Sequence, residues 1–154
     1  MMNALIERKR KLKEYAEKRG LVALYLFGSV AQGRATRLSD VDIAVLLPHG
    51  DAANLFEKRL RLVVDLMELL GESDVDLVVL NEAPPLLCHR ILTEGELIYA
   101  RDEGERARFE ARKVLEYLDF KPVLELQHAY MRRRLKEGQF GHRPRYRRTA
   151  AEKA

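Results

Sequence analysis

Short apolar runs alternate with longer amphipathic segments along this chain of 154 residues. The apolar runs predict buried strands over 21–27, 41–47, 75–80 and 96–99. Apolar residues at helical spacing predict helices over 2–18, 52–70, 86–93 and 103–136, with a short helical turn over 30–33. Alternating helices and short strands indicate an α/β (α+β) fold, in which a small mixed sheet of about four strands is flanked by helices and followed by a C-terminal helical extension.

Glycine, proline and a capping residue mark the ends of several predicted elements. Gly20 is placed to end the first helix, and Gly71 is placed to end the helix that Asp51 would cap at its start. Pro122 lies inside the last helical segment, where it predicts a kink or a break.

The charge of the chain is concentrated at its C-terminal end. Residues 121–154 contain ten Lys/Arg and three Asp/Glu, whereas the whole chain has a net charge of +4. This asymmetry argues against nucleic-acid binding by the whole surface and leaves only the basic tail as a candidate for it. We expect a core over 1–100, a helical segment over 101–137 that docks on a partner, and a flexible tail over 138–154.

Several function classes are disfavoured by composition. No apolar run approaches the roughly 20 residues that a membrane span needs, and the first residues do not resemble a signal peptide, so we expect a cytoplasmic protein with no membrane role. The single cysteine, Cys88, lies among apolar residues and is expected to be a buried thiol. The histidines lack partners at metal-ligand spacing. They are His49, His89, His128 and His142.

One stretch places small polar residues and paired carboxylates between two predicted strands. Gly28-Ser29 follows the first strand, and Asp40-x-Asp42 opens the second. Positions i and i+2 of a strand share a face, so Asp40 and Asp42 would repel each other unless a cation lay between them. Mg²⁺ binds one or two carboxylates together with phosphate oxygens. The stretch therefore predicts a site for a nucleoside triphosphate and its magnesium.

Neighbouring residues extend this site. Gly28 allows the backbone to approach a phosphate, and the Ser29 hydroxyl and nearby N–H groups can donate to phosphate oxygens. Gly33 relieves the next turn, and Ser39 can cap or orient the strand that carries the acids. Two arginines are close enough in sequence to help neutralise a triphosphate, and the sequence does not distinguish between them: Arg34 and Arg37.

A third acid, Asp76, lies on another predicted strand. If the strands are neighbours, Asp76 could bind metal or act as general base on an attacking hydroxyl. Asp74 shares its face and competes for this role, but its position at the start of the strand favours a turn or cap. The structural alternatives are an exposed turn for Asp-x-Asp and a strand-edge charge for Asp76. The combination of Gly-Ser and Asp-x-Asp, each beside an apolar strand, favours the catalytic interpretation.

Gly28-Ser29 followed by Asp40-x-Asp42 resembles the signature of the DNA polymerase β-like nucleotidyltransferase superfamily. Residues 76–86, 90–95 and 109–122 are similar to the minimal nucleotidyltransferase (MNT) family, in particular to the antitoxins of HEPN–MNT toxin–antitoxin pairs. The resemblance covers about residues 1–141. It implies that Gly28 and Ser29 hold the nucleotide phosphates, that Asp40 and Asp42 hold the metals, and that Asp76 is the third acid.

The resemblance further implies an Mg²⁺-dependent enzyme that transfers AMP from ATP to a tyrosine of a partner HEPN ribonuclease toxin and so blocks it. Three alternatives stay open from the sequence: nucleotidyl transfer to a small molecule such as an aminoglycoside, neutralisation of the toxin by binding alone, and RNA binding through the basic tail. Asp40→Asn with Asp42→Asn separates catalysis from binding, because a passive antitoxin would tolerate both changes.

Overall fold

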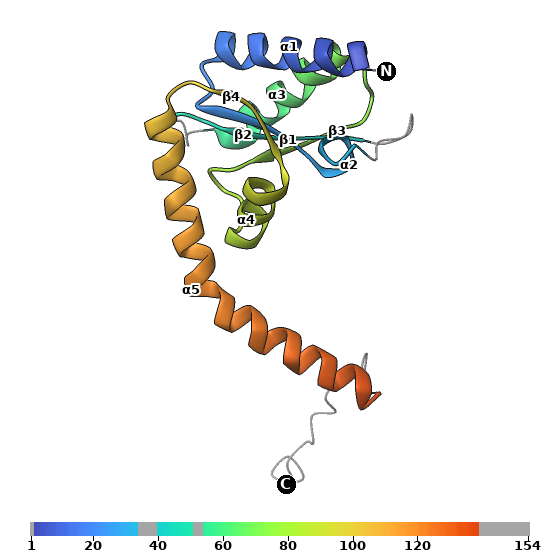
Figure 1. Ribbon diagram of the computed structural model, residues 1–154, viewed down its shortest axis with the longest axis vertical. Coiled ribbons are helices and arrows are strands. Elements are labelled where there is room, and N and C mark those ends of the chain that lie inside the picture. The colour runs from blue at the N-terminus through green and yellow to red at the C-terminus, as the bar shows by residue number, and fades with distance from the viewer. Residues whose placement is uncertain (1, 34–39, 51–53, 139–154) are drawn as a thin grey trace, which may run out of the picture. The chain divides into compact units, whose positions relative to one another are not determined.

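The computed structural model describes residues 2–33, 40–50 and 54–138 (Figure 1). The chain divides into two compact units, Met1–Leu118 and Asp119–Ala154. Helices and strands follow one another in an order that matches the predicted one: α1 (Met2–Arg19), β1 (Ala23–Phe27), α2 (Gly28–Ala31), β2 (Val41–Leu46), α3 (Leu55–Leu70), β3 (Val75–Val79), α4 (Pro85–Glu94), β4 (Glu96–Ala100) and α5 (Glu103–Lys136).

The strands form one mixed sheet in the order β3-β2-β1-β4. Strand β1 is antiparallel to both of its neighbours, and β2 is parallel to β3. This arrangement confirms the predicted small mixed sheet of about four strands. It also brings the end of β1 beside the beginnings of β2 and β3, which is where the sequence places its acids.

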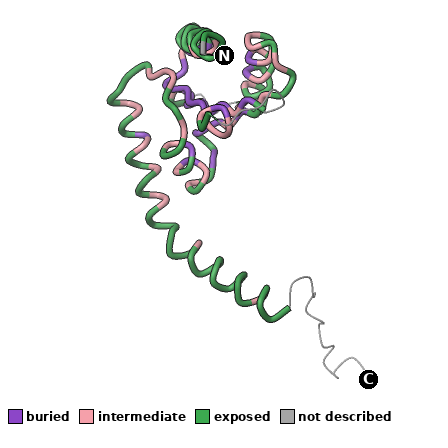
Figure 2. Tube along the Cα trace, turned by 45° about the vertical axis from the view of Figure 1, so that its right-hand side comes forward, coloured by how far each residue is buried: buried purple, intermediate pink, exposed green. Residues whose placement is uncertain are grey.

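Helices cover both faces of this sheet, because alternate strand residues point to opposite sides. Helices α1 and α3 pack on one face, and α4 with the first turns of α5 pack on the other. Figure 2 shows the buried positions gathered along the sheet and on the helix sides that meet it. The first cluster includes Leu12, Ala16, Leu24, Leu26, Ile43, Leu62 and Leu66. The second includes Ala23, Tyr25, Ala44, Cys88, Ile91 and Phe109.

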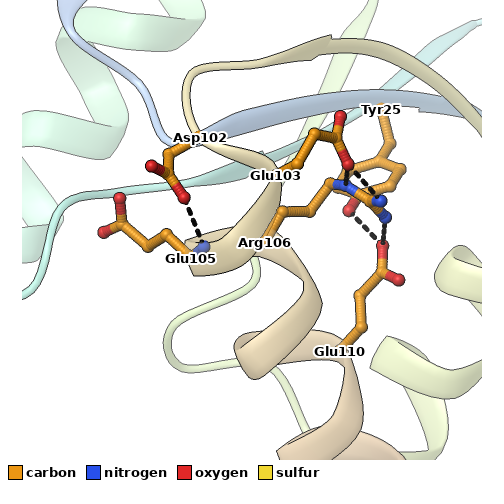
Figure 3. A network of polar contacts seen from close by, with 6 residues as sticks. All are labelled: Tyr25, Asp102, Glu103, Glu105, Arg106 and Glu110. Carbon is orange, nitrogen blue, oxygen red and sulfur yellow. Dashed lines mark hydrogen bonds and ion pairs between the residues drawn. The ribbon is translucent and has the colours of Figure 1, made fainter.

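A polar network attaches the start of α5 to β1 (Figure 3). The Tyr25 hydroxyl donates to Glu110 Oε1 at 2.7 Å, and Arg106 Nη1 donates to the same oxygen at 2.6 Å. Burial, followed by the bond to Glu110, raises the pKa of Tyr25, so this hydroxyl remains a donor. The Asp102 carboxylate accepts from the backbone N–H of Glu105 at 2.7 Å and thereby caps the helix.

Some of the predicted helix ends are confirmed and others are wrong. Gly20 and Gly71 both adopt left-handed backbone conformations, with φ of +65° at each, and Gly71 is the C-cap of α3. The N-cap of α3 is Asn54 rather than Asp51, which lies outside the described residues. Of the kink or break predicted at Pro122, the break is wrong, because α5 continues through this residue. Proline removes one hydrogen bond to the carbonyl of Leu118, and that residue is 52% exposed, so water can satisfy this oxygen.

Cys88 and His89 occupy structural positions on α4. The Cys88 side chain is fully buried, and its Sγ lies 3.5 Å from the carbonyl oxygen of Ala83. This burial confirms the expectation of a buried thiol, and it raises the pKa of the Cys88 side chain. His89 stacks on Tyr117 with ring centroids 3.9 Å apart. Among the described residues, no helix is long and apolar enough to cross a membrane.

Candidate active site

Strand register brings the predicted acids of β2 and β3 together. Asp42 is the register partner of Phe27 on β1 and of Asp76 on β3. Register partners on neighbouring strands lie about 4.8 Å apart and point to the same face, so the two carboxylates leave the sheet side by side. Asp40 precedes β2 by one residue and lies two positions before Asp42, which directs it toward the same region.

Gly28 makes room for the Asp42 carboxylate. Its φ is +68°, and a Cβ built on it would lie 2.0 Å from Asp42 Oδ2 and 2.8 Å from Asp42 Cγ. Only glycine satisfies both the left-handed backbone and the close approach. The sequence suggested that Gly28 lets a phosphate approach the backbone. The structure adds that Gly28 leaves the space that the Asp42 carboxylate occupies.

The electrostatics of Asp42 indicate a site that favours a cation. Burial, and then the negative charges of Asp76 and Asp40, raise the pKa of the Asp42 carboxyl. Asp42 is half-buried, whereas Asp40 and Asp76 are exposed. The charged form of Asp42 is therefore disfavoured at the end of the sheet, and a bound cation would reverse that effect.

The acids suit a magnesium ion that binds together with a phosphate substrate, rather than a metal held by protein ligands alone. In the described part of the chain, no three side chains of His, Cys, Asp or Glu form a ready-made metal-binding group. Mg²⁺ in nucleotide sites is held by one or two carboxylates, and its other ligands are waters and phosphate oxygens. Asp42 with Asp40 or Asp76 meets that requirement, and a triphosphate would complete the coordination.

The Gly-Ser segment lies directly beside the acids. Helix α2 begins at Gly28, where β1 ends, and the half-buried Ser29 is its second residue. Gly33 has φ of +66°, with no atom within 4 Å of a Cβ built on it, and its N–H donates to the Val30 carbonyl at 3.2 Å. Gly33 is therefore a turn residue, as expected. Ser39 and the candidate arginines Arg34 and Arg37 lie outside the described residues.

Two further residues shape this end of the sheet. Asp74 lies in the connection between α3 and β3, directly before the strand, as the sequence favoured, and its carbonyl accepts from the backbone N–H of Val41 at 3.2 Å. Gly95 was expected only to separate two elements. A Cβ on Gly95 would lie 2.4 Å from the Ile91 carbonyl oxygen and 3.1 Å from that of Leu26. Gly95 thus permits close packing next to the end of β1, and no local sequence signal indicated this.

Comparison with known proteins defines the class of this fold and site. Residues 10–104 match the polymerase beta nucleotidyltransferase family, and this range contains the Gly-Ser segment and all three acids. The chain belongs to this family of nucleotidyltransferases.

Its relatives narrow the assignment to MntA-like minimal nucleotidyltransferases. It is 32% identical over 110 residues to the protein adenylyltransferase MntA of Aphanizomenon flos-aquae, covering 67% of this chain and 73% of that protein. It is 39% identical over 87 residues to the protein of the same name from Shewanella oneidensis, covering 55% of this chain and 58% of that one. A crystal structure of a toxin–antitoxin with AMP-PNP superposes with a TM-score of 0.69 at 28% identity, over 80% of this chain and 97% of that one.

Proposed function

We propose that this chain is an antitoxin that AMPylates a tyrosine of a partner HEPN ribonuclease toxin, using ATP and Mg²⁺, and thereby neutralises it. The observation that carries the proposal is the placement of Asp42 against Gly28 and in register with Asp76. Two relatives are named protein adenylyltransferases, and a similar toxin–antitoxin structure contains AMP-PNP, an ATP analogue. These similarities support ATP as the substrate and a toxin as the partner.

Each site residue has a distinct task in this proposal. Asp40 and Asp42 hold the metal, with Asp76 as the third acid. Bound magnesium would offset the negative charge of the triphosphate and of the leaving pyrophosphate. The Ser29 hydroxyl donates to a phosphate oxygen, and Gly28 keeps the Asp42 carboxylate in place while allowing the backbone to approach the nucleotide.

The transfer is a single displacement of pyrophosphate at the α-phosphorus of ATP. The tyrosine oxygen forms a bond to the α-phosphorus of ATP as the bond between that phosphorus and the bridging oxygen of the β-phosphate breaks. Pyrophosphate leaves with the electron pair of the broken bond. The phenolic proton passes to a site carboxylate, and we assign this role to Asp76, which is exposed and so accessible to an incoming hydroxyl.

The last part of α5 provides a surface for the partner. Within the unit Asp119–Ala154, the helix exposes large apolar side chains that this unit does not cover, including Leu126, Tyr130 and Leu135 with exposures of 72%, 60% and 58%. Exposed apolar residues at this density are typical of protein interfaces. We propose that the core over 1–100 performs the transfer, that the segment over 101–137 docks on the toxin, and that 138–154 forms a separate basic tail.

A transfer assay tests this function. The purified chain is incubated with ATP labelled at the α-phosphate, Mg²⁺ and the HEPN toxin that we expect to be its partner, and the toxin is expected to become labelled. The double variant Asp40→Asn with Asp42→Asn should give no label. Glu17→Gln, which changes an exposed acid on α1, serves as the matched control and should retain activity. An unlabelled toxin with the wild-type chain would refute the proposal.

Neutralisation by binding alone is the second candidate, and the exposed apolar residues of α5 favour it. Full protection of cells by the Asp40→Asn, Asp42→Asn variant would establish it. Transfer to a small molecule is tested separately, by measuring pyrophosphate release with a panel of acceptors that includes an aminoglycoside. Release with a small acceptor and none with the toxin would replace the proposed substrate class.

A further inference from the structure

A cleft lies at the opposite end of the sheet from the acids. It has a volume of about 840 Å³, which is within the range of small-ligand sites. Strand β2 runs from Val41, beside the acids, to Leu46, which lines this cleft. The first turns of α5 form the opposite wall. The cleft therefore belongs to the same compact unit as the acids but is separated from them by the length of a strand.

The floor of this cleft is apolar and firmly held. Val22, Leu46, Leu47 and Phe109 line it, and each is at most 6% exposed. The Asn81 side chain fixes the end of β2, because its oxygen accepts from the Leu47 N–H at 2.8 Å and its amide donates to the Leu47 carbonyl at 3.0 Å. An apolar floor of this kind can bury a flat ring or another apolar group of a ligand.

Cations line the wall formed by α5. Arg108 and Arg112 are four residues apart, so they project from the same side of the helix. The Arg112 guanidinium lies 5.7 Å from the centroid of the Phe109 ring. In the part of the chain that the structure describes, neither arginine forms an ion pair. Lys113 is already paired, to Glu116 at 2.8 Å.

Most of the acids that line the cleft are neutralised by other residues. Glu116 is paired with Lys113, and Glu105 is paired with Arg101 at 2.8 Å. Glu82 is the remaining carboxylate, and it forms no ion pair with a described residue. Two guanidiniums and one carboxylate that line the cleft are therefore outside ion pairs with described residues, which leaves a net positive charge. The cleft thus favours an anion with an apolar body.

We propose that this cleft binds a nucleoside phosphate as an effector, separately from the nucleotide at the acids. The base would lie on the apolar floor near Phe109, and the phosphates would accept hydrogen bonds from Arg108 and Arg112, whose planar guanidiniums match phosphate oxygens. Among the described residues that line the cleft, Glu105 and Glu116 are already paired with cations, so we expect this binding not to require Mg²⁺. It does not depend on the proposed toxin modification, because binding is measured on the antitoxin alone.

Calorimetric titration of the full chain with AMP-PNP tests the proposal. The wild-type chain should bind two molecules with Mg²⁺ and one with EDTA. Arg108→Glu with Arg112→Glu should remove the Mg²⁺-independent event, because each lost guanidinium weakens binding about ten-fold or more. Asp40→Asn with Asp42→Asn should remove only the Mg²⁺-dependent event. Arg59→Glu, which reverses an exposed arginine on α3 that does not line the cleft, should behave as the wild type.

If the variant Arg108→Glu with Arg112→Glu retains the Mg²⁺-dependent event, it is folded. Arg108→Gln with Arg112→Gln is a milder change that should also weaken the Mg²⁺-independent event. Adenosine, which lacks phosphate, should bind the cleft at least about ten-fold more weakly than AMP-PNP. The proposal is overturned if the wild-type chain binds no nucleotide in EDTA, or if that binding survives the loss of both arginines. Equal weakening by Arg59→Glu would also overturn it, because the effect would then be one of net charge.

Discussion

Gly28→Ala tests the central contact of the proposed site. Alanine at this position must adopt φ of +68°, and its Cβ would lie 2.0 Å from Asp42 Oδ2. That distance is far shorter than any non-bonded contact between carbon and oxygen. The Asp42 carboxylate must therefore move or the backbone must shift, and either change disturbs the group that we expect to hold the metal.

The expected magnitudes separate the effect on stability from the effect on activity. The left-handed backbone should cost alanine about 1–2 kcal/mol, and displacement of the Asp42 side chain from its rotamer should add about 0.5–1.5 kcal/mol. Together these costs are about 1.5–3.5 kcal/mol, which lowers the melting temperature by about 3–14 °C in a chain of this length. Displacing a catalytic group by about 1 Å can reduce the rate about 100-fold. Transfer should therefore fall much further than stability.

Gly33→Ala is the matched control for this experiment. Gly33 has a similar φ of +66°, but no atom lies within 4 Å of its added Cβ, so the variant has the backbone cost without the contact with Asp42. Urea unfolding measures the stability of both variants, and label transfer from ATP measures their activity. Gly28→Ala should lose about 100-fold more activity than Gly33→Ala. If the two variants have similar transfer rates, the contact with Asp42 does not position a catalytic group.

Three further predictions follow from particular contacts. Tyr25→Phe removes the bond to Glu110 and should reduce the free energy of unfolding by about 1–2 kcal/mol in urea titrations; an unchanged value would contradict the anchoring role of this bond. Cys88 should react with iodoacetamide far more slowly at pH 8 in the folded than in the unfolded chain, and equal reactivity would refute its burial. Because burial raises the pKa of the thiol, the neutral Cys88 side chain stabilises the fold below the ordinary thiol pKa, and this contribution is lost as pH rises above that pKa. Leu126→Ser should change the melting temperature little, because the side chain is 72% exposed, but should weaken toxin binding about ten-fold in calorimetry; wild-type affinity would exclude Leu126 from the interface.

The number and order of the elements could be predicted because they depend on local pattern. The run that predicts β2 is apolar at nearly every position, as expected of a strand buried on both faces, and the spacing of Leu62 and Leu66 directs one side of α3 toward the sheet. The break at Pro122 was wrong because solvent can satisfy a carbonyl on an exposed helix, and local pattern does not reveal exposure.

The candidate site was predicted only in part. The Gly-Ser and Asp-x-Asp segments identified Gly28, Asp40 and Asp42 as candidates, because both lie beside apolar runs. The sequence could not show that Asp76 is the register partner of Asp42, since that depends on which strands are neighbours. Nor could it show that Gly95 packs closely against the carbonyl of Leu26. Both features join segments that are distant along the chain.

The sequence by itself therefore determined the fold class, the two strands that flank the proposed phosphate-binding segment and the residue types suited to magnesium. These follow from local periodicity and from the chemistry of single side chains. The tertiary structure decided that Asp42 and Asp76 are adjacent, that Gly28 leaves space for the Asp42 carboxylate, and that Arg108 and Arg112 face an apolar cleft at the other end of the sheet. The physical reason is that strand order, register and helix placement result from packing the whole core, so contacts between distant segments are not encoded in any one of them.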